Sequence, residues 1–235
     1  MIRTSMILRS FTKRFLLLLA AIAFSCFASG QSFKEKMQGV SKKYASVINL
    51  HMRMAIQVFD DGETSNATYS INADIKKKDR NYQYEFGAMS MLMNSNYIIV
   101  ADKASKQIVC TNRSIKGEME FEKGLYRINM DSILAFYDEP VMIGIQDDIE
   151  HYRVFQKKGA IKQVDLFINQ KTSMLTRVEY GYREQQHVVI DFLEADTNPA
   201  FEPDTFEESR YVIKQKGNWK AVGAFAGFAV AMENK

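Results

Sequence analysis

Histidine and cysteine are the residues of this sequence best suited to metal binding or nucleophilic catalysis, and their spacing favours neither. His51, His151 and His187 each lie in an alternating segment with polar neighbours, and none has a second ligand at the spacing of an HxxxH or CxxC motif. We interpret them as histidines on exposed strand faces. Cys110 lies in an apolar segment, where cysteine usually acts as a small buried hydrophobic residue.

Acidic residues are the other candidates for chemistry. DDIEH at 147–151 and DEP at 138–140 could contribute to a calcium site, but they lack its regular spacing of oxygen ligands, so we interpret them as solvated loops. The alternative is a hydrolase or glycan-active enzyme with dispersed carboxylates on wet strand faces, namely Asp165, Glu179 and Asp191. Because no GxSxG, Walker-type or glycine-rich phosphate motif occurs, we expect no catalysis, metal or cofactor.

The first thirty residues have the features of a secretory signal. Basic residues precede the apolar run FLLLLAAIAF at 15–24, which is too short for a bilayer span of roughly 18 residues or more. ASG at 28–30 supplies the small residues of a cleavage site. We expect residues 1–30 to be a cleaved signal peptide and the mature chain to lie in the periplasm of a Gram-negative-type bacterium. The alternative is an outer-membrane lipoprotein anchored through Cys26.

The charge of the mature chain excludes nucleic acid as a partner. The sequence has 31 basic and 28 acidic residues, and its first thirty residues hold four basic residues and no acidic one, which leaves 27 against 28 and a net charge of −1. Nucleic-acid binding needs a clustered basic face instead. The remaining length suits one domain with a sizeable core. With Cys26 removed, Cys110 has no partner for an internal disulfide.

Two helices are expected. In SFKEKMQGVSKKY, Ser32 and Glu35 have the spacing of a capping box, and apolar residues recur at helical intervals. The stripe consists of Phe33, Met37, Val40 and Tyr44. A helix this short is unstable alone, so its stripe must lie on an apolar surface. A second, short helix is expected in DSILAFYDEP at 131–140, where Pro140 follows its end.

Most of the chain alternates with the period of a strand. INLHMRMAIQV at 48–58 and ATYSINADI at 67–75 predict a long antiparallel hairpin with one wet side. In YEFGAMSMLM the apolar positions shift by one residue at Gly87, which we interpret as a β-bulge that bends the strand. We expect an α+β fold with a strongly curved antiparallel sheet of about nine to eleven strands, an incomplete β-barrel covered by both helices.

The apolar face of these strands is the candidate binding site. Methionine is flexible and polarizable, so it is common on surfaces that bind variable apolar ligands and poor at specifying one tight core. The predicted cavity lining is Met52, Met54, Tyr69, Tyr82, Tyr84, Phe86, Met89, Met91 and Met93. An ordinary methionine-rich core under the helix is the alternative.

The C-terminal end differs in composition from the rest. Residues 214–235, which we call the tail, are rich in Gly, Ala and Phe, and their apolar run is too short to span a membrane. We expect them to form a final strand or a plug docked on the sheet. The alternative is a flexible tail. Residues 31–213 then form the main domain.

The order of elements resembles a known family. The chain has a signal peptide, an amphipathic helix, a long hairpin, the run YEFGAMSMLMNSNYIIVADKASKQIVCTN, a short internal helix and a closing set of strands ending in PAFEPDTFEESRYV. This order resembles the LolA/LolB-like superfamily of periplasmic lipoprotein carriers and outer-membrane receptors. The resemblance covers residues 32 to about 213. It implies a half-barrel whose hydrophobic interior holds acyl chains.

A function follows from this resemblance as an expectation. The chain would bind lipid acyl chains or a lipidated protein, with the two helices as a lid formed by Phe33, Met37, Val40, Tyr44, Ile133 and Leu134. The arginine that controls the lid in carriers has no assigned counterpart here. The tail has no counterpart in the family either. The alternative is therefore a non-catalytic interaction subunit of a cell-envelope assembly, which uses Trp219 to Met232 as the strand that pairs with its partner.

Overall fold

The computed structural model describes residues 33–60, 66–113 and 137–233. The chain divides into two compact units, Met1–Met37 and Gln38–Lys235. Helix α2 (Phe33–Ser46) begins in the first unit and continues into the second, with Glu35 in its first turn and Lys43 in its last. Both charges suit the helix dipole. All features described below belong to the second unit unless stated.

Fourteen strands follow among the described residues. The first six are β1 (Asn49–Phe59), β2 (Tyr69–Lys78), β3 (Asn81–Phe86), β4 (Met89–Met93), β5 (Tyr97–Asp102) and β6 (Gln107–Asn112). The next five are β7 (Val141–Gln146), β8 (Ile149–Phe155), β9 (Ile161–Asn169), β10 (Met174–Tyr182) and β11 (His187–Asp196). The last three are β12 (Val212–Gln215), β13 (Asn218–Ala221) and β14 (Ala229–Glu233), with the 3-10 turns η1 (Glu208–Arg210) and η2 (Gly223–Phe225) between them.

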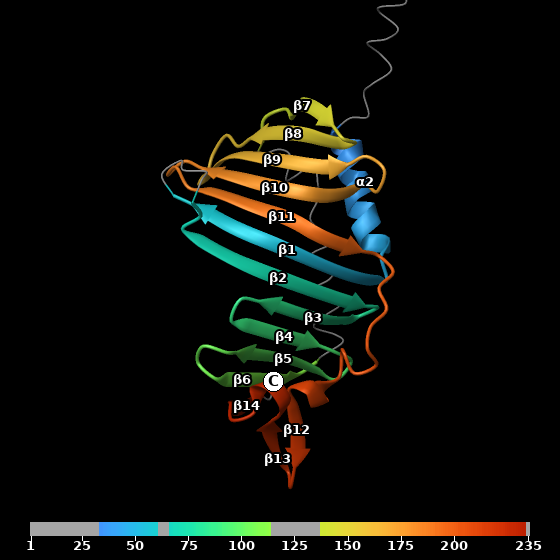
Figure 1. The fold of residues 1–235 in the computed structure, drawn as a ribbon, viewed down its shortest axis with the longest axis vertical. Helices are drawn as coiled ribbons and strands as arrows, with labels where there is room; N and C mark the ends of the chain where they lie inside the picture. The colour runs from blue at the N-terminus through green and yellow to red at the C-terminus, as the bar shows by residue number, and fades with distance from the viewer. Residues whose placement is uncertain (1–32, 61–65, 114–136, 234–235) are drawn as a thin grey trace, which may run out of the picture. The chain divides into compact units, whose positions relative to one another are not determined.

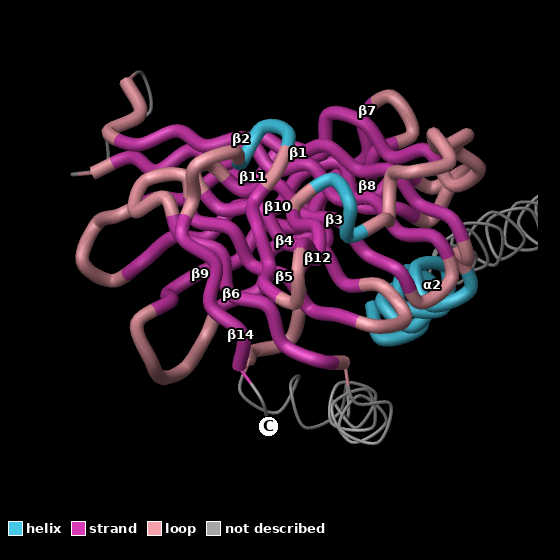
Figure 2. The backbone as a smooth tube through the Cα atoms, turned by 90° about the horizontal axis from the view of Figure 1, so that it is seen from below, coloured by secondary structure: helices cyan, strands magenta, loops and turns pink. Residues whose placement is uncertain are grey.

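Twelve strands form one open sheet in the order β14-β6-β5-β4-β3-β2-β1-β11-β10-β9-β8-β7, and β12 pairs with β13 in a separate hairpin. Neighbours in the sheet are antiparallel except β14 and β6, which are parallel. Figure 1 shows the strands side by side in this order, and Figure 2 shows that strands dominate the described chain. The α+β class with an open antiparallel sheet is confirmed, while the strand number exceeds the expected nine to eleven.

The expected bulge at Gly87 is wrong, because the segment is a hairpin of two strands. β3 ends at Phe86, β4 begins at Met89, and Phe86 pairs directly with Met89. Gly87 has φ +56°, which suits the first residue of a two-residue hairpin loop. Such a loop places residue i opposite residue i+3, so even positions on one strand face odd positions on the next. A one-residue shift of the apolar period therefore fits a tight turn as well as a bulge.

The second expected helix falls mainly outside the described residues, as do Ile133 and Leu134. Tyr137, the last residue of the expected helix at 132–137, is described and forms an antiparallel bridge with Gln156 instead of a helical turn. The bridge continues the pairing of β7 with β8.

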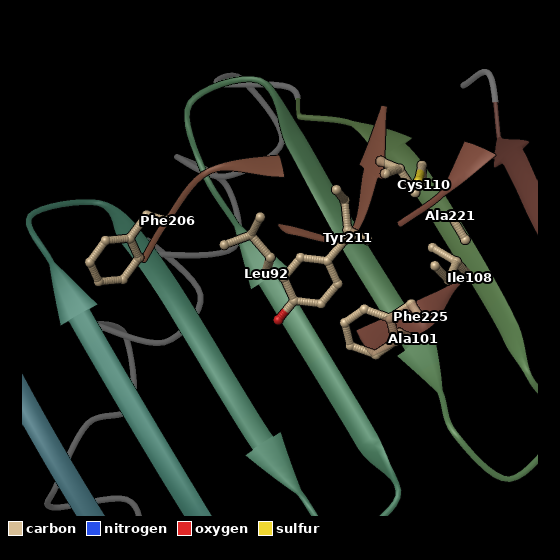
Figure 3. Packing of buried hydrophobic residues seen from close by; sticks show 10 residues of the cluster. Leu92, Ala101, Ile108, Cys110, Phe206, Tyr211, Ala221 and Phe225 are labelled. Carbon is tan, nitrogen blue, oxygen red and sulfur yellow. The ribbon is translucent and has the colours of Figure 1, made fainter. Parts of the chain in front are cut away.

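The largest buried cluster joins the tail to the sheet. Side chains of β4 to β6 are covered by the segment from Phe206 to Phe225, and Figure 3 shows Tyr211 and Phe225 over Leu92, Ala101 and Ile108. The rings of Tyr211 and Phe225 are stacked with centroids 4.8 Å apart. A second cluster of Val47, Leu50, Met52 and Met174 lies against Tyr44 of α2. The tail strand β14 completes one edge of the sheet.

Candidate functional site

All nine residues predicted to line a cavity lie on one face of the sheet. Residues directly opposite on neighbouring strands share a face. One row across β1 to β4 is Met52, Ile75, Tyr84 and Met91, and the next is Met54, Ala73, Phe86 and Met89. Tyr82 pairs with Met93, and Tyr69 pairs with Val58. Eight of the nine therefore lie in three adjacent rows, while Tyr69 lies two rows beyond Met54.

The β3–β4 hairpin holds the densest part of this face. We call its six residues the aromatic–methionine patch, which consists of Tyr82, Tyr84, Phe86, Met89, Met91 and Met93. The rings of Tyr82 and Tyr84 are stacked with centroids 5.9 Å apart. Burial, with a smaller contribution from the neighbouring Tyr82, raises the pKa of Tyr84 to about 12. The patch is thus an apolar surface in which the phenol of Tyr84 stays neutral.

Exposure changes along this face. Tyr69, Phe86 and Met89 are 56%, 45% and 41% exposed, although each is a large apolar or aromatic side chain. Met91 and Met93 are half-buried. Met52 is buried in the cluster that Tyr44 contacts, and Met54 packs at its border. The face therefore runs from a covered end near α2 to an open end at the turn of the β3–β4 hairpin.

The residues expected to form a lid are only partly placed. Val40 is buried, and Tyr44 packs on the cluster that contains Met52. Burial raises the pKa of Tyr44. Phe33 and Met37 belong to the first compact unit.

The opposite face of β1, β2 and β8 to β11 carries paired charges. Arg177 donates two hydrogen bonds to Asp191, at 2.6 and 3.1 Å. Arg53 donates one to Glu194 at 2.6 Å. The interpretation of this side as the wet face agrees with these pairs. A carboxylate held by arginine has little freedom to act as a general acid or base.

Asp165 is the most buried carboxylate of this face, with a side chain 4% exposed. It hydrogen-bonds His151 at 2.5 Å, Arg153 at 2.8 Å and Gln163. Burial alone would raise the pKa of Asp165, but these hydrogen bonds outweigh burial and hold the pKa below its ordinary value. Asp165 is therefore a structural anion that joins β8 to β9.

The three histidines are less exposed than expected, because each is paired with a carboxylate. His51 lies 3.2 Å from Asp74, and His187 lies 3.3 Å from Glu179. The side chains of His51, His151 and His187 are 22%, 21% and 27% exposed. Cys110, by contrast, is buried as expected, and burial raises the pKa of its thiol to about 11.

A hydrogen-bonded network that the sequence did not reveal lies beneath Tyr211, on the same face of the sheet as the paired charges. Fully buried Ser90 lies 2.7 Å from the hydroxyl of Tyr211 and donates to Glu85 at 2.6 Å. Lys103 then binds Glu85 at 2.7 Å. The only hint in the sequence was Ser90 itself, a polar residue within MSMLM. These contacts fix the segment around Tyr211, just before the tail, to the sheet.

Three grooves lined by described residues lie elsewhere than the aromatic–methionine patch. A groove of about 530 Å³ beside β1 and β2 is lined largely by polar residues that include Arg53, Asn72 and Asp74. A second, of about 360 Å³, adjoins Tyr211 and Phe225, and a third, of about 420 Å³, adjoins β7. Within the described ranges, no group of three or more His, Cys, Asp or Glu side chains could hold a metal ion.

No helix in residues 33–60, 66–113 and 137–233 combines the length and hydropathy needed to cross a membrane. No protein-family model matches the sequence, and no curated protein matches it.

Several solved structures resemble this chain. Lipoprotein LppX of Mycobacterium tuberculosis is 12% identical with a TM-score of 0.43, and the match covers 74% of this chain and 99% of that one. A LolA superfamily protein from Nitrosomonas europaea is 12% identical with a TM-score of 0.32, over 73% and 97% of the two chains. A chain of the Pseudomonas aeruginosa MucA/MucB complex is 9% identical with a TM-score of 0.45, over 84% and 63%. A member of the superfamily that the sequence resembles is thus among these solved structures.

Proposed function

We propose that this protein is an exported, non-catalytic carrier that holds the acyl chains of a lipid or lipidated protein on the apolar face of its sheet. The observation that supports the proposal is the register of the β3–β4 hairpin, which places three methionines directly opposite three aromatic rings. Flexible thioether side chains adapt to an apolar ligand of variable shape. The open end of this face, at Phe86 and Met89, offers the ligand a way in.

The helix α2 is the lid of this proposal. Its residue Tyr44 packs on the cluster that contains Met52, and an acyl chain would replace this contact with its own. Because each buried CH₂ group contributes about 0.8 kcal/mol, binding depends on chain length more than on the headgroup. The domain that carries the function is residues 31–213, following removal of the signal peptide 1–30.

The test uses displacement of the fluorescent probe 1-anilinonaphthalene-8-sulfonate by fatty acids of increasing length, below their micelle concentrations. We expect Kd to fall about fourfold for each added CH₂ group, the equivalent of 0.8 kcal/mol. Met91→Asp places a charge in the centre of the patch and should raise Kd by about tenfold or more. Ile213→Asp, at an exposed isoleucine of the separate β12–β13 hairpin, is the control and should leave Kd unchanged.

A Kd for fatty acids that does not depend on chain length, or that Met91→Asp leaves unchanged, would contradict the proposal. Mass spectrometry of protein purified natively from the cell envelope then reports any bound lipid and the mature N-terminus. That measurement also decides between cleavage near Gln31 and lipidation of Cys26.

A further inference from the structure

Among the described residues, strand β7 lies at an edge of the sheet, and no described segment pairs with its outer side. It is the last strand of the twelve-stranded sheet, and all six of its residues are exposed. Val141, Ile143 and Ile145 are 50%, 49% and 56% exposed. Soluble proteins usually blunt such an edge with lysine, proline or a covering segment, because its free N–H and C=O groups can pair with another chain. The sequence VMIGIQ contains none of these protecting residues.

A groove beside β7 supplies a place for a side chain. The register with β8 shifts between Met142 and Gly144, which leaves Ile143 unpaired, and Ile143 and Ile145 line a groove of about 420 Å³. His151 and Phe167 also line the groove, and their rings are stacked with centroids 4.3 Å apart. In strand addition, the main chain provides affinity and such pockets select particular side chains. This groove fits a large apolar side chain.

Acidic residues lie at both ends of β7 and favour a partner with basic residues. Asp138 and Glu139 precede the strand, and Asp147 and Asp148 follow it. Lys157 pairs with Asp138, and Lys171 with Asp148. Within the described ranges, Glu139 and Asp147 have no ion pair, so one carboxylate remains available at each end.

A second copy of the chain fits this edge poorly. An antiparallel pair centred between Ile143 and Gly144 would bring the apolar residues together but place Glu139 opposite Asp148 at both ends. Like charges directly opposite each other destabilise a strand pair.

We propose that β7 docks an extended segment of a partner protein that adds to the sheet as a further strand, places a large apolar side chain in the groove, and carries a basic residue at each end. This interaction surface is separate from the aromatic–methionine patch, and it does not depend on the proposed lipid binding.

The probe is a fluorescein-labelled heptapeptide with lysine at both ends, alternating valine and threonine, and phenylalanine at the centre. We expect saturable binding in low salt by fluorescence anisotropy. Replacing the terminal lysines by glutamate, or the central phenylalanine by alanine, should each weaken binding by about tenfold. High salt should weaken the lysine peptide as well. Bound peptide should slow hydrogen exchange of the amides in 141–146.

Ile145→Lys should weaken binding more than about tenfold, because lysine blocks an edge strand and repels the peptide. Ile213→Lys is the matched control, since Ile213 is an exposed isoleucine on β12, and it should leave Kd within about twofold. Circular dichroism checks that both variants fold. Absence of saturable binding, equal affinity for the glutamate peptide, or an Ile145→Lys variant that binds normally would overturn the proposal. So would a dimer in analytical ultracentrifugation that Ile145→Lys abolishes, because the occupant would then be a second copy.

Discussion

Tyr84 and Met91 lie directly opposite each other on the antiparallel strands β3 and β4. Their pairing exists because the chain reverses within the two residues Gly87 and Ala88. This short loop is what places the aromatic residues of one strand over the methionines of the next. The aromatic–methionine patch therefore depends on the conformation of Gly87.

Gly87→Ala should destabilise the protein by about 1–2 kcal/mol, the cost of a left-handed conformation for a residue with a Cβ. The φ of Gly87 is +56°, and an added Cβ would lie 2.5 Å from Cδ1 of Ile71. Gly39→Ala is the matched control, because Gly39 lies inside α2 and an added Cβ would meet no atom within 4 Å apart from the helix's own backbone. This substitution should stabilise the helix by about 0.5–1 kcal/mol. Urea unfolding followed by circular dichroism measures both. Equal effects of the two substitutions would contradict the hairpin turn.

The sequence predicted which residues share the apolar face, because alternation specifies faces without specifying partners. It could not separate a bulge from a tight turn at Gly87, since both shift the period by one residue. It predicted a final strand or docked plug at residues 214–235, but it did not indicate that β4 to β6 would be the strands covered. That packing depends on Phe225 stacking on Tyr211 within the cluster over these strands, and local periodicity carries no information on contacts between distant parts of the chain.

Phe225→Ala should cost about 3–5 kcal/mol of unfolding free energy, the usual range for removing a buried phenylalanine. Phe225 is 6% exposed, stacks on Tyr211 and meets Phe228 edge to face. Phe155→Ala, at a phenylalanine that is 37% exposed, is the control and should cost much less. Chemical denaturation measures both. A loss at Phe225 no larger than at Phe155 would mean that the tail does not contribute to the fold.

Asp165→Asn should cost about 3 kcal/mol at neutral pH, as expected when one partner of a buried ion pair is removed. The pKa of Asp165 is lowered in the folded state, so its contribution is present above the unfolded pKa of about 4 and is lost as the pH falls through the folded value. Unfolding measured from pH 7 to pH 2 should therefore show a smaller acid-dependent loss in the variant. Asp148→Asn, at an exposed pair with Lys171, should cost less than about 1 kcal/mol. A parallel pH dependence of wild type and Asp165→Asn would contradict this role.

Cys110 should make the protein less stable in alkali. Burial raises the pKa of its thiol from 9.0 to about 11, so the folded state keeps the thiol neutral while the unfolded state ionises. The contribution of Cys110 is then fully present below pH 9 and decreases as the pH rises toward 11, by about 2–3 kcal/mol in total. Unfolding free energies of wild type and Cys110→Ala, compared from pH 8 to pH 10.5, should converge as the pH rises, because only the wild type loses the contribution of the thiol. Tyrosine ionisation affects both proteins equally and cancels in the comparison. A difference that stays constant over this range would show that the thiol ionises as readily in the folded chain as in the unfolded one.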